Sequence, residues 1–158
     1  MQRPMRRKDR EITKEEAMLL LKDAEYGMLA TVGSDNIPYA VPMNYALIDN
    51  SIYLHCATEG HKIDNIQSNP NVSFTVVGKT QPVHEGNDYS SFFESVIAFG
   101  KVRFVKDEKE FRDSLYILTE KYFPDGMAEF DAIMARYDMS RLYVIAIDLE
   151  HVSGKAKR

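Results

Sequence analysis

The chain has 158 residues, of which 44% are apolar and 28% are charged, and its formal net charge at pH 7 is −4. This length suits one domain over residues 1–158, and the apolar fraction is too high for a mostly disordered chain. The sequence has no run of about 18 uncharged apolar residues, which argues against a membrane partner and a membrane-spanning helix. We therefore expect a soluble globular protein.

The amino-terminal segment, residues 1–11, is basic, and we call it the basic arm. It lacks the apolar stretch and cleavage site of a secretory signal, and a single cysteine, Cys56, excludes a disulfide within the chain. These features predict a cytoplasmic protein. Three interpretations of the arm stay open: a solvated terminus, a contact with nucleic acid or membrane, and a cover over an anionic ligand. The cations of the arm are Arg3, Arg6, Arg7, Lys8 and Arg10.

The first ten residues carry these five cations and one acid, Asp9, and without them the rest of the chain has a net charge of −8. A net-acidic body repels polyphosphate, so we expect no nucleic-acid partner.

Turn residues and apolar periodicity divide the chain into short strands with a few helices between them. The capping-box sequence Thr13–Glu16 predicts a helix start, and the apolar residues that follow it share one face. Strands are predicted over residues 27–32, 37–47, 51–55, 72–77, 95–105 and 142–149, and further helices over 62–68, 106–122 and 130–137. Residues 78–93 are interpreted as a polar loop and 151–158 as a polar tail.

Two features locate irregularities in the predicted sheet. Pro38 and Pro42 lie within one predicted strand, which should therefore be bent or lie at an edge. Gly100 indicates a kink in the 95–105 strand. Six strands joined mostly by tight turns favour a mainly β (α+β) fold, an antiparallel barrel with peripheral helices, over a doubly wound parallel sheet. Dinucleotide and triphosphate-binding glycine motifs are absent from the sequence, which agrees with this choice.

The segment from Ser51 to Ser68 is the most informative for function. A strand ends near His55, a short polar turn follows, and Lys62 opens a helix. Helix amino termini offer free N–H groups, Thr58 adds a hydroxyl, Gly60 allows close approach, and His61 and Lys62 add cationic donors. This turn is a candidate phosphate cradle, and the plain alternative is an exposed helix with a capped start.

Metal and nucleophile chemistry find little support. His55, Cys56 and His61 are potential zinc or copper ligands, but neighbouring strand residues point to opposite faces and no metal-binding spacing is present. We therefore predict no metal site. Cys56 lacks an identifiable partner for nucleophilic catalysis, and free cysteines are usually buried.

Several stretches together resemble the pyridoxamine 5′-phosphate oxidase-like, FMN-binding split-barrel family, and most closely its nitroimidazole-resistance (Nim) subgroup. They occur in the family's order between Arg6 and Leu149, and the basic arm followed by a His-x4-Gly-x-Lys turn is the most specific part. The stretches are MRRKDREIT (Met5–Thr13), the Gly27–Leu47 block, YLHCATEGHK (Tyr53–Lys62), NPNVSFTVV (Asn69–Val77) and SVIAFGKVRFV (Ser95–Val105).

The resemblance implies a six-stranded split β-barrel and a homodimer with FMN at the subunit interface. It implies an FMN-dependent oxidoreductase, a nitroreductase of the nitroimidazole-resistance type, that passes electrons from NAD(P)H through FMN to a small-molecule acceptor. The phosphate falls on Thr58, His61 and Lys62, with Gly60 also among the cofactor-binding residues, and His55 takes the catalytic position. The flavin ring falls on Pro42, Met43, Asn44, Tyr45 and His55, and Ser95 is a further, weaker match.

Two departures from the subgroup affect this assignment. Cys56 stands where the subgroup often has glycine, and His61 stands where arginine is common. An imidazole holds a phosphate less firmly than a guanidinium, so FMN affinity is in question. The alternative is a non-catalytic module that binds flavin or haem, with His55 as an axial ligand in the haem case. A pyridoxamine phosphate oxidase proper is disfavoured because the chain is short and has few basic phosphate-binding residues.

Overall fold

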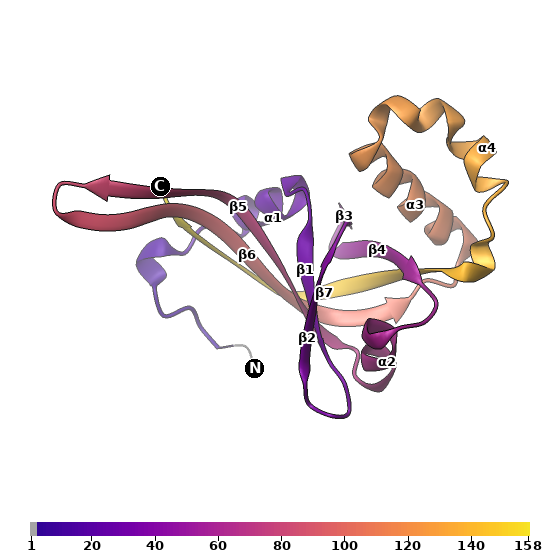
Figure 1. Cartoon of the computed structure of the whole chain (residues 1–158), viewed down its shortest axis with the longest axis horizontal. Coiled ribbons are helices and arrows are strands. Elements are labelled where there is room, and N and C mark those ends of the chain that lie inside the picture. The colour runs from indigo at the N-terminus through magenta and orange to yellow at the C-terminus, as the bar shows by residue number, and fades with distance from the viewer. Residues whose placement is uncertain (1–2) are drawn as a thin grey trace.

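The computed structural model describes residues 3–158, so Met1 and Gln2 of the basic arm lie outside it. Its strands form one antiparallel sheet in the order β2-β1-β5-β6-β7-β4-β3 (Figure 1). The strands are β1 (Gly27–Val32), β2 (Pro38–Met43), β3 (Ala46–Ile48), β4 (Ser51–Ala57), β5 (Asn71–Glu85), β6 (Asp88–Phe104) and β7 (Leu142–Lys157). The α-helices are α1 (Lys14–Asp23), α2 (His61–Ser68), α3 (Glu108–Tyr122) and α4 (Phe130–Met134), and short 3-10 turns cover Lys8–Arg10, Pro124–Glu129 and Met139–Arg141.

The sheet is curled into a half-barrel. Strands β2 and β3 are its two edges, yet only Asn44 and Tyr45 separate them in the sequence. A two-residue connection cannot cross a flat seven-stranded sheet, so the sheet must bend until its edges approach each other. The prediction of an antiparallel, curled mainly β fold with peripheral helices is therefore confirmed, and Pro38 and Pro42 lie on the edge strand β2 as expected.

The prediction of six strands is wrong, because the segment 37–47 forms two strands. Strand β2 pairs with β1, whereas β3 pairs with β4 at the other edge. At the break, the backbone N–H of Tyr45 donates a 2.9 Å hydrogen bond to the hydroxyl of Tyr122. A tertiary partner for this N–H satisfies the backbone where the ladder is interrupted.

The predicted polar loop 78–93 and polar tail 151–158 are also wrong. Strands β5 and β6 continue as a long hairpin through those loop residues to a turn at Gly86, whose φ of 60° suits a tight hairpin turn. The supposed tail pairs with β6 as the end of β7. Both segments are strands with one solvated face. Polar side chains cover that face, and for this reason the sequence looked like loop and tail rather than strand. The kink expected at Gly100 is confirmed as a register shift between Phe99 and Gly100.

Two hydrophobic clusters cover different parts of the sheet. The first fills the concave face and is closed by α1 and α2, which contribute residues such as Leu21 and Ile63. The second lies between α3, α4 and the outer face of β4 and β7, around Leu118, Phe130 and Val144. Within residues 3–158, no helix is long and apolar enough to cross a membrane.

The start of α1 fixes the end of the basic arm beside β7. Thr13 and Glu16 form the predicted capping box, with reciprocal hydrogen bonds of 3.0 and 3.1 Å. The preceding residue, Ile12, donates its backbone N–H to the carbonyl of Gly154 at 3.1 Å. The arm therefore leaves the helix along the outer part of β7 (Figure 1).

Candidate functional site

The junction between β4 and α2, residues 58–62, has the features of an anion cradle. Gly60 caps the helix with a φ of 120°, and a side chain at this position would meet nothing within 4 Å. The space in front of the helix is therefore open, and the backbone conformation favours glycine. The backbone N–H groups of Ile63 and Asp64 donate to the Gly60 carbonyl at 2.8 and 3.1 Å, which leaves those of His61 and Lys62 at the start of the helix for a ligand. Thr58 and Lys62 are half-buried beside it.

An aromatic contact ties this junction to the edge of the sheet. The His61 ring lies 4.3 Å from the Tyr39 ring, centroid to centroid, at an interplanar angle of 36°. Tyr39 belongs to β2, so the junction and edge strand β2 face each other across the curled sheet. A second contact links α2 to β1: the buried Asn65 side-chain amide donates a 3.0 Å hydrogen bond to the Thr31 hydroxyl. Sequence reasoning missed Tyr39, because only tertiary structure brings β2 to α2.

The four predicted flavin-ring residues of the 42–45 segment do not share one face. Pro42 and Asn44 are exposed, whereas Met43 packs against the core and Tyr45 is completely buried. Alternation along an extended chain explains this division. Pro42 and Asn44 are therefore available to a ligand, and the side chains of Met43 and Tyr45 contribute to the core.

Tyr45 and Tyr122 hold the break between β2 and β3. The Tyr45 hydroxyl donates a hydrogen bond to the Leu21 carbonyl, and the Tyr122 hydroxyl donates to the Glu25 carbonyl at 2.6 Å. The Lys121 ammonium lies 4.0 Å from the centre of the Tyr45 ring. Burial raises the pKa of Tyr45, so this phenol stays protonated.

We expect Tyr122→Phe to lower the free energy of unfolding by about 1–3 kcal/mol, because the Tyr45 N–H loses its partner. Urea titration followed by circular dichroism measures this change. Tyr116→Phe is the matched control, since Tyr116 lies on the same helix and is 43% exposed. Equal stability of the two variants would contradict a role of the Tyr122 hydroxyl in holding the strand break.

His55 faces a different cavity from the junction. This cavity has a volume of about 150 Å³ and lies under α3 and α4, with Asn44 and Tyr122 beside His55. The His55 side chain reaches solvent on one side, but apolar residues such as Leu115 and Leu142 surround the rest. This burial lowers the pKa of His55, so its neutral form is favoured near pH 7. The structure thus brings His55 and Asn44 together.

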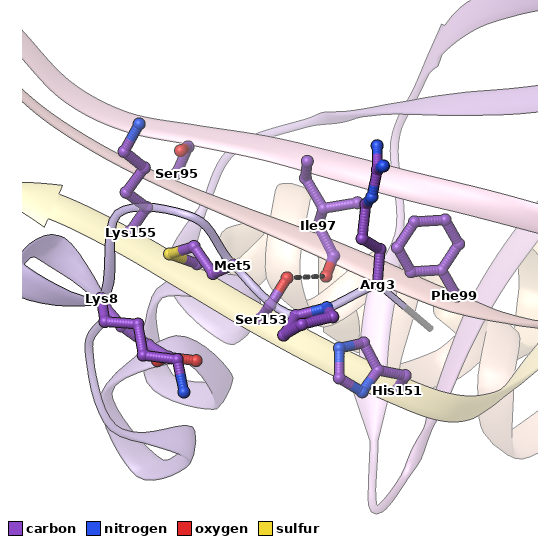
Figure 2. Close-up of a pocket in the computed structure, with 11 residues that line it drawn as sticks. Arg3, Met5, Lys8, Ser95, Ile97, Phe99, His151, Ser153 and Lys155 are labelled. Carbon is purple, nitrogen blue, oxygen red and sulfur yellow. Dashed lines mark hydrogen bonds between the residues drawn. The ribbon is translucent and has the colours of Figure 1, made fainter. Parts of the chain in front are cut away.

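Ser95 lies apart from the other predicted site residues of the chain. It faces a larger cavity of about 570 Å³, between the basic arm and the outer face of β6 and β7 (Figure 2). Within one chain, this cavity and the junction lie at different ends of the sheet, because the end of β4 pairs with the beginning of β7 and Ser95 pairs with Lys155 near its end.

Cys56 and the histidines form no second reactive centre among the described residues. Cys56 is buried on the concave face, where burial raises the pKa of its thiol and disfavours the thiolate. Within residues 3–158, no three His, Cys, Asp or Glu side chains lie close enough together to hold a metal ion.

The family model for pyridoxamine 5′-phosphate oxidase matches residues 13–156, which is nearly the whole chain. The chain belongs to the pyridoxamine 5′-phosphate oxidase family. Its half-barrel is the split-barrel fold of that family. A comparison with curated protein sequences finds no match.

Solved structures with the same fold belong to proteins of several kinds. A candidate 5-nitroimidazole antibiotic resistance protein from Bacteroides thetaiotaomicron is 26% identical, with a TM-score of 0.78 over 92% of this chain and 86% of that chain. A flavocytochrome from Azotobacter vinelandii is 14% identical, with a TM-score of 0.79 over 98% and 72%. An FAD- and haem-binding protein from Mycobacterium smegmatis is 19% identical, with a TM-score of 0.77 over 92% and 72%.

In this member of the family, the junction and the edge strand form the candidate site. The junction supplies Lys62, His61 and the helix N–H groups, and β2 supplies Pro42 and Asn44. His55 lies three residues before Thr58, on the side of the sheet that α3 and α4 cover. A phosphate fits the open, cationic junction, and an uncharged ring system fits the exposed edge of β2.

Proposed function

We propose that this protein is an FMN-dependent oxidoreductase that passes electrons from NAD(P)H through FMN to a small acceptor, in particular a nitroaromatic compound such as a nitroimidazole. The observation that carries the proposal is the open, glycine-led junction at residues 58–62, which Tyr39 holds against the edge strand. The similarity to the described nitroimidazole resistance protein supports the choice of acceptor.

The residues of the junction bind the phosphate of FMN in this proposal. Lys62 offers a charged donor, Thr58 a hydroxyl, and the first turn of α2 offers N–H groups with the positive end of the helix dipole. Pro42 and Asn44 contact the ring, and the proline leaves neighbouring backbone groups of the edge strand available to its polar rim. Bound FMN supplies the acceptance and transfer of a hydride, and the chain supplies its position and surroundings.

Lys62→Gln is expected to raise the dissociation constant of FMN about tenfold, because the phosphate loses a charge-assisted hydrogen bond. Quenching of FMN fluorescence on titration with the protein measures this constant. Lys106→Gln makes the same charge change at an exposed position between β6 and α3 and should leave FMN affinity unaltered. If Lys62→Gln binds FMN as tightly as the wild type does, the phosphate does not bind at Lys62 and the proposed phosphate site is wrong.

We also propose a homodimer with FMN at the subunit interface. Two rows of residues cross the outer face of the sheet in register, and neither contains Asp, Glu, Lys or Arg. Ile97 remains 41% exposed in one row and Ala40 is exposed in the other. Such a face is typical of a surface that a second copy covers. The rows are Pro42, Met28, Thr75, Ile97 and Ser153, and Ala40, Ala30, Ser73, Phe99 and His151.

In this dimer we propose that Ser95 of one subunit approaches the junction of the other subunit. Ser95 is remote from the junction of its own chain but lies on the same outer face as these rows. Light scattering after gel filtration should give twice the monomer mass for the wild type, and a monomer for Thr75→Glu, which introduces a charge in the middle of a row. A wild-type monomer at micromolar concentration would reject the dimer.

An absorption spectrum of the purified protein tests the proposed function most directly. We expect an oxidised flavin spectrum that bleaches on anaerobic addition of NADH or NADPH and recovers when a nitroimidazole is added. A flavin that no nucleotide reduces would favour a non-catalytic flavin-binding module. A colourless protein that gains no flavin on titration with FMN would reject the proposal, and an intense Soret band would indicate a haem-binding module instead.

A further inference from the structure

The cavity beside His55 lies between the outer face of the sheet and a helical segment, residues 108–137, which we call the cap. The cap contains α3 and α4 and covers one end of the sheet (Figure 1). We call the space beneath it the cap cavity, and its volume is about 150 Å³. An apolar cavity of about this size binds benzene in another protein. The cap cavity therefore has room for one aromatic ring.

The walls of the cap cavity are mainly apolar. Leu115 and Leu118 of α3 are buried, and Met134 of α4 is half-buried. All three side chains line the cavity. Because such walls offer no partner to a charge, they disfavour ionic compounds and favour an uncharged ring.

Two polar side chains line the cap cavity on the sheet side. They are His55 of β4 and Asn44 at the break between β2 and β3. On the helix side, the hydroxyls of Thr119 and Tyr122 are already engaged. Thr119 donates to a carbonyl of its own helix at 2.8 Å, and Tyr122 donates to the Glu25 carbonyl at 2.6 Å. His55 and Asn44 can each donate a hydrogen bond to an oxygen that the ring carries, such as a nitro oxygen.

The mouth of the cap cavity is aromatic. Phe123 and Tyr137 line the cavity, although they are 66% and 56% exposed. Phe123 directly follows α3, and Tyr137 lies just beyond the end of α4, so both helices of the cap contribute to the opening. A flat ring at this opening can stack on either side chain. The mouth and the walls therefore favour the same kind of ligand.

Contacts within the cap fix the volume of the cap cavity. Arg112 of α3 forms an ion pair with Asp131 of α4 at 2.5 Å, and its guanidinium lies 5.5 Å from the centre of the Phe130 ring. The buried Phe130 ring also packs edge-on against Tyr116 of α3, with centroids 5.1 Å apart. These contacts fasten α4 to α3 before a ligand arrives. A larger ligand would therefore have to disrupt them in order to enter.

We infer that the cap cavity selects its ligand by size: it binds uncharged aromatic compounds of one ring and excludes compounds of two fused rings. Met134 is the specificity-determining residue, because it lines the cavity from the cap and is only half-buried. The inference rests on the proposed function for one point, that the ligand is the electron acceptor. Asn44 contacts the flavin ring in that proposal, so a ring beside Asn44 lies next to the flavin.

Equilibrium dialysis of the full chain with two nitro compounds tests the inference. The probes are 5-nitroimidazole, which has one ring, and 5-nitrobenzimidazole, which has two fused rings. Excess FMN in the solution keeps both probes out of the flavin site. We expect the wild type to bind 5-nitroimidazole about tenfold more tightly than 5-nitrobenzimidazole. Met134→Ala enlarges the cavity and should strengthen binding of 5-nitrobenzimidazole about tenfold, whereas Met134→Phe fills the cavity and should weaken binding of 5-nitroimidazole about tenfold.

Met127→Ala is the matched control for the Met134 variants. Met127 also belongs to the cap and is half-buried, but it is not among the described lining residues of the cavity. This variant should leave both affinities within about twofold of the wild type. Phe123→Ala, at the exposed mouth, should weaken binding of 5-nitroimidazole about fivefold. It keeps the test valid if the Met134 variants do not fold.

The outcomes separate this inference from the proposed function. Equal affinity of the wild type for the two probes, no binding of 5-nitroimidazole at millimolar concentration, or the same affinities in Met127→Ala and Met134→Ala would overturn the inference. If the probes bind as expected to a protein that takes up no FMN, the proposed function is rejected and the size-selective site stands. If the FMN-bound protein binds and reduces both probes equally well, the proposed function stands and the size selection is rejected.

Discussion

At acid pH, His55→Gln is expected to reduce kcat/KM for the nitroaromatic acceptor about a hundredfold. We propose His55 as the proton donor to the acceptor, because it shares a cavity with Asn44, which contacts the flavin ring in the proposed function. Glutamine keeps an N–H donor at this position but does not titrate. His55→Leu removes the N–H donor as well. If kcat/KM falls further in His55→Leu than in His55→Gln, the difference is the contribution of a hydrogen bond that polarises the acceptor. Stopped-flow reoxidation of the reduced protein gives these rates.

The pH dependence of kcat/KM tests the same role of His55, because the direction of the pKa shift predicts whether the rate rises or falls with pH. Burial lowers the pKa of His55 in the folded state, so the imidazolium that donates a proton forms only below the ordinary histidine pKa of about 6.5. We therefore expect kcat/KM of the wild type to rise as the pH falls through this lowered pKa. The His55→Gln profile should lack this rise. Identical profiles would exclude proton donation by His55.

Stability should change in the opposite direction over the same pH range. Because the folded-state pKa of His55 is lowered, the unfolded chain binds the proton first as the pH falls. The contribution of His55 to stability is therefore fully present above pH about 6.5 and is lost as the pH falls through the folded-state pKa. Urea titrations at several pH values should show this loss in the wild type and a smaller loss in His55→Gln.

Phe74→Ala is expected to lower the free energy of unfolding by about 3–5 kcal/mol, the largest stability effect that we predict. Phe74 is completely buried at the centre of the concave-face cluster, and its ring packs edge-on against Tyr45 with centroids 4.8 Å apart. Leu19→Ala is the control, since Leu19 is 60% exposed on α1 and should change stability by less than about 0.5 kcal/mol.

Gly27 makes this prediction more specific. A side chain at Gly27 would overlap the Phe74 ring, so Gly27→Ala alone should cost about 1–3 kcal/mol through overpacking. In the Phe74→Ala background the added methyl enters the vacated space. The double variant should therefore be more stable than the sum of the two single effects predicts. Strict additivity in urea titrations would show that Gly27 is not kept small by Phe74.

The phosphate cradle illustrates how far local sequence reasoning reaches. Thr58, Gly60, His61 and Lys62 were predicted to lie where a strand gives way to a helix, and the structure places them at the junction of β4 and α2. Their role as FMN ligands stays a prediction. The contact of His61 with Tyr39 was not predictable, because it depends on how far the sheet curls.

The residues 42–45 show the limit of assigning a ligand to a consecutive block. The resemblance to the family placed all four at the flavin ring, but alternation sends Met43 and Tyr45 into the core and leaves Pro42 and Asn44 exposed. The alternation of side chains along a strand could have been predicted from the sequence. The break between β2 and β3 could not, because it depends on Tyr122, which lies 77 residues further along the chain.

The sequence by itself determined the local features of this protein: the capping box of α1, a bent or edge position for the proline-containing strand, the kink at Gly100 and the glycine-led junction. Each follows from the preferences of a few neighbouring residues. The tertiary structure decided the seventh strand and the long hairpin of β5 and β6. It also placed Ser95 far from the junction, in a cavity between the basic arm and the sheet. These depend on register and packing between segments distant in sequence, and local preferences do not encode which partner a strand or an arm will meet.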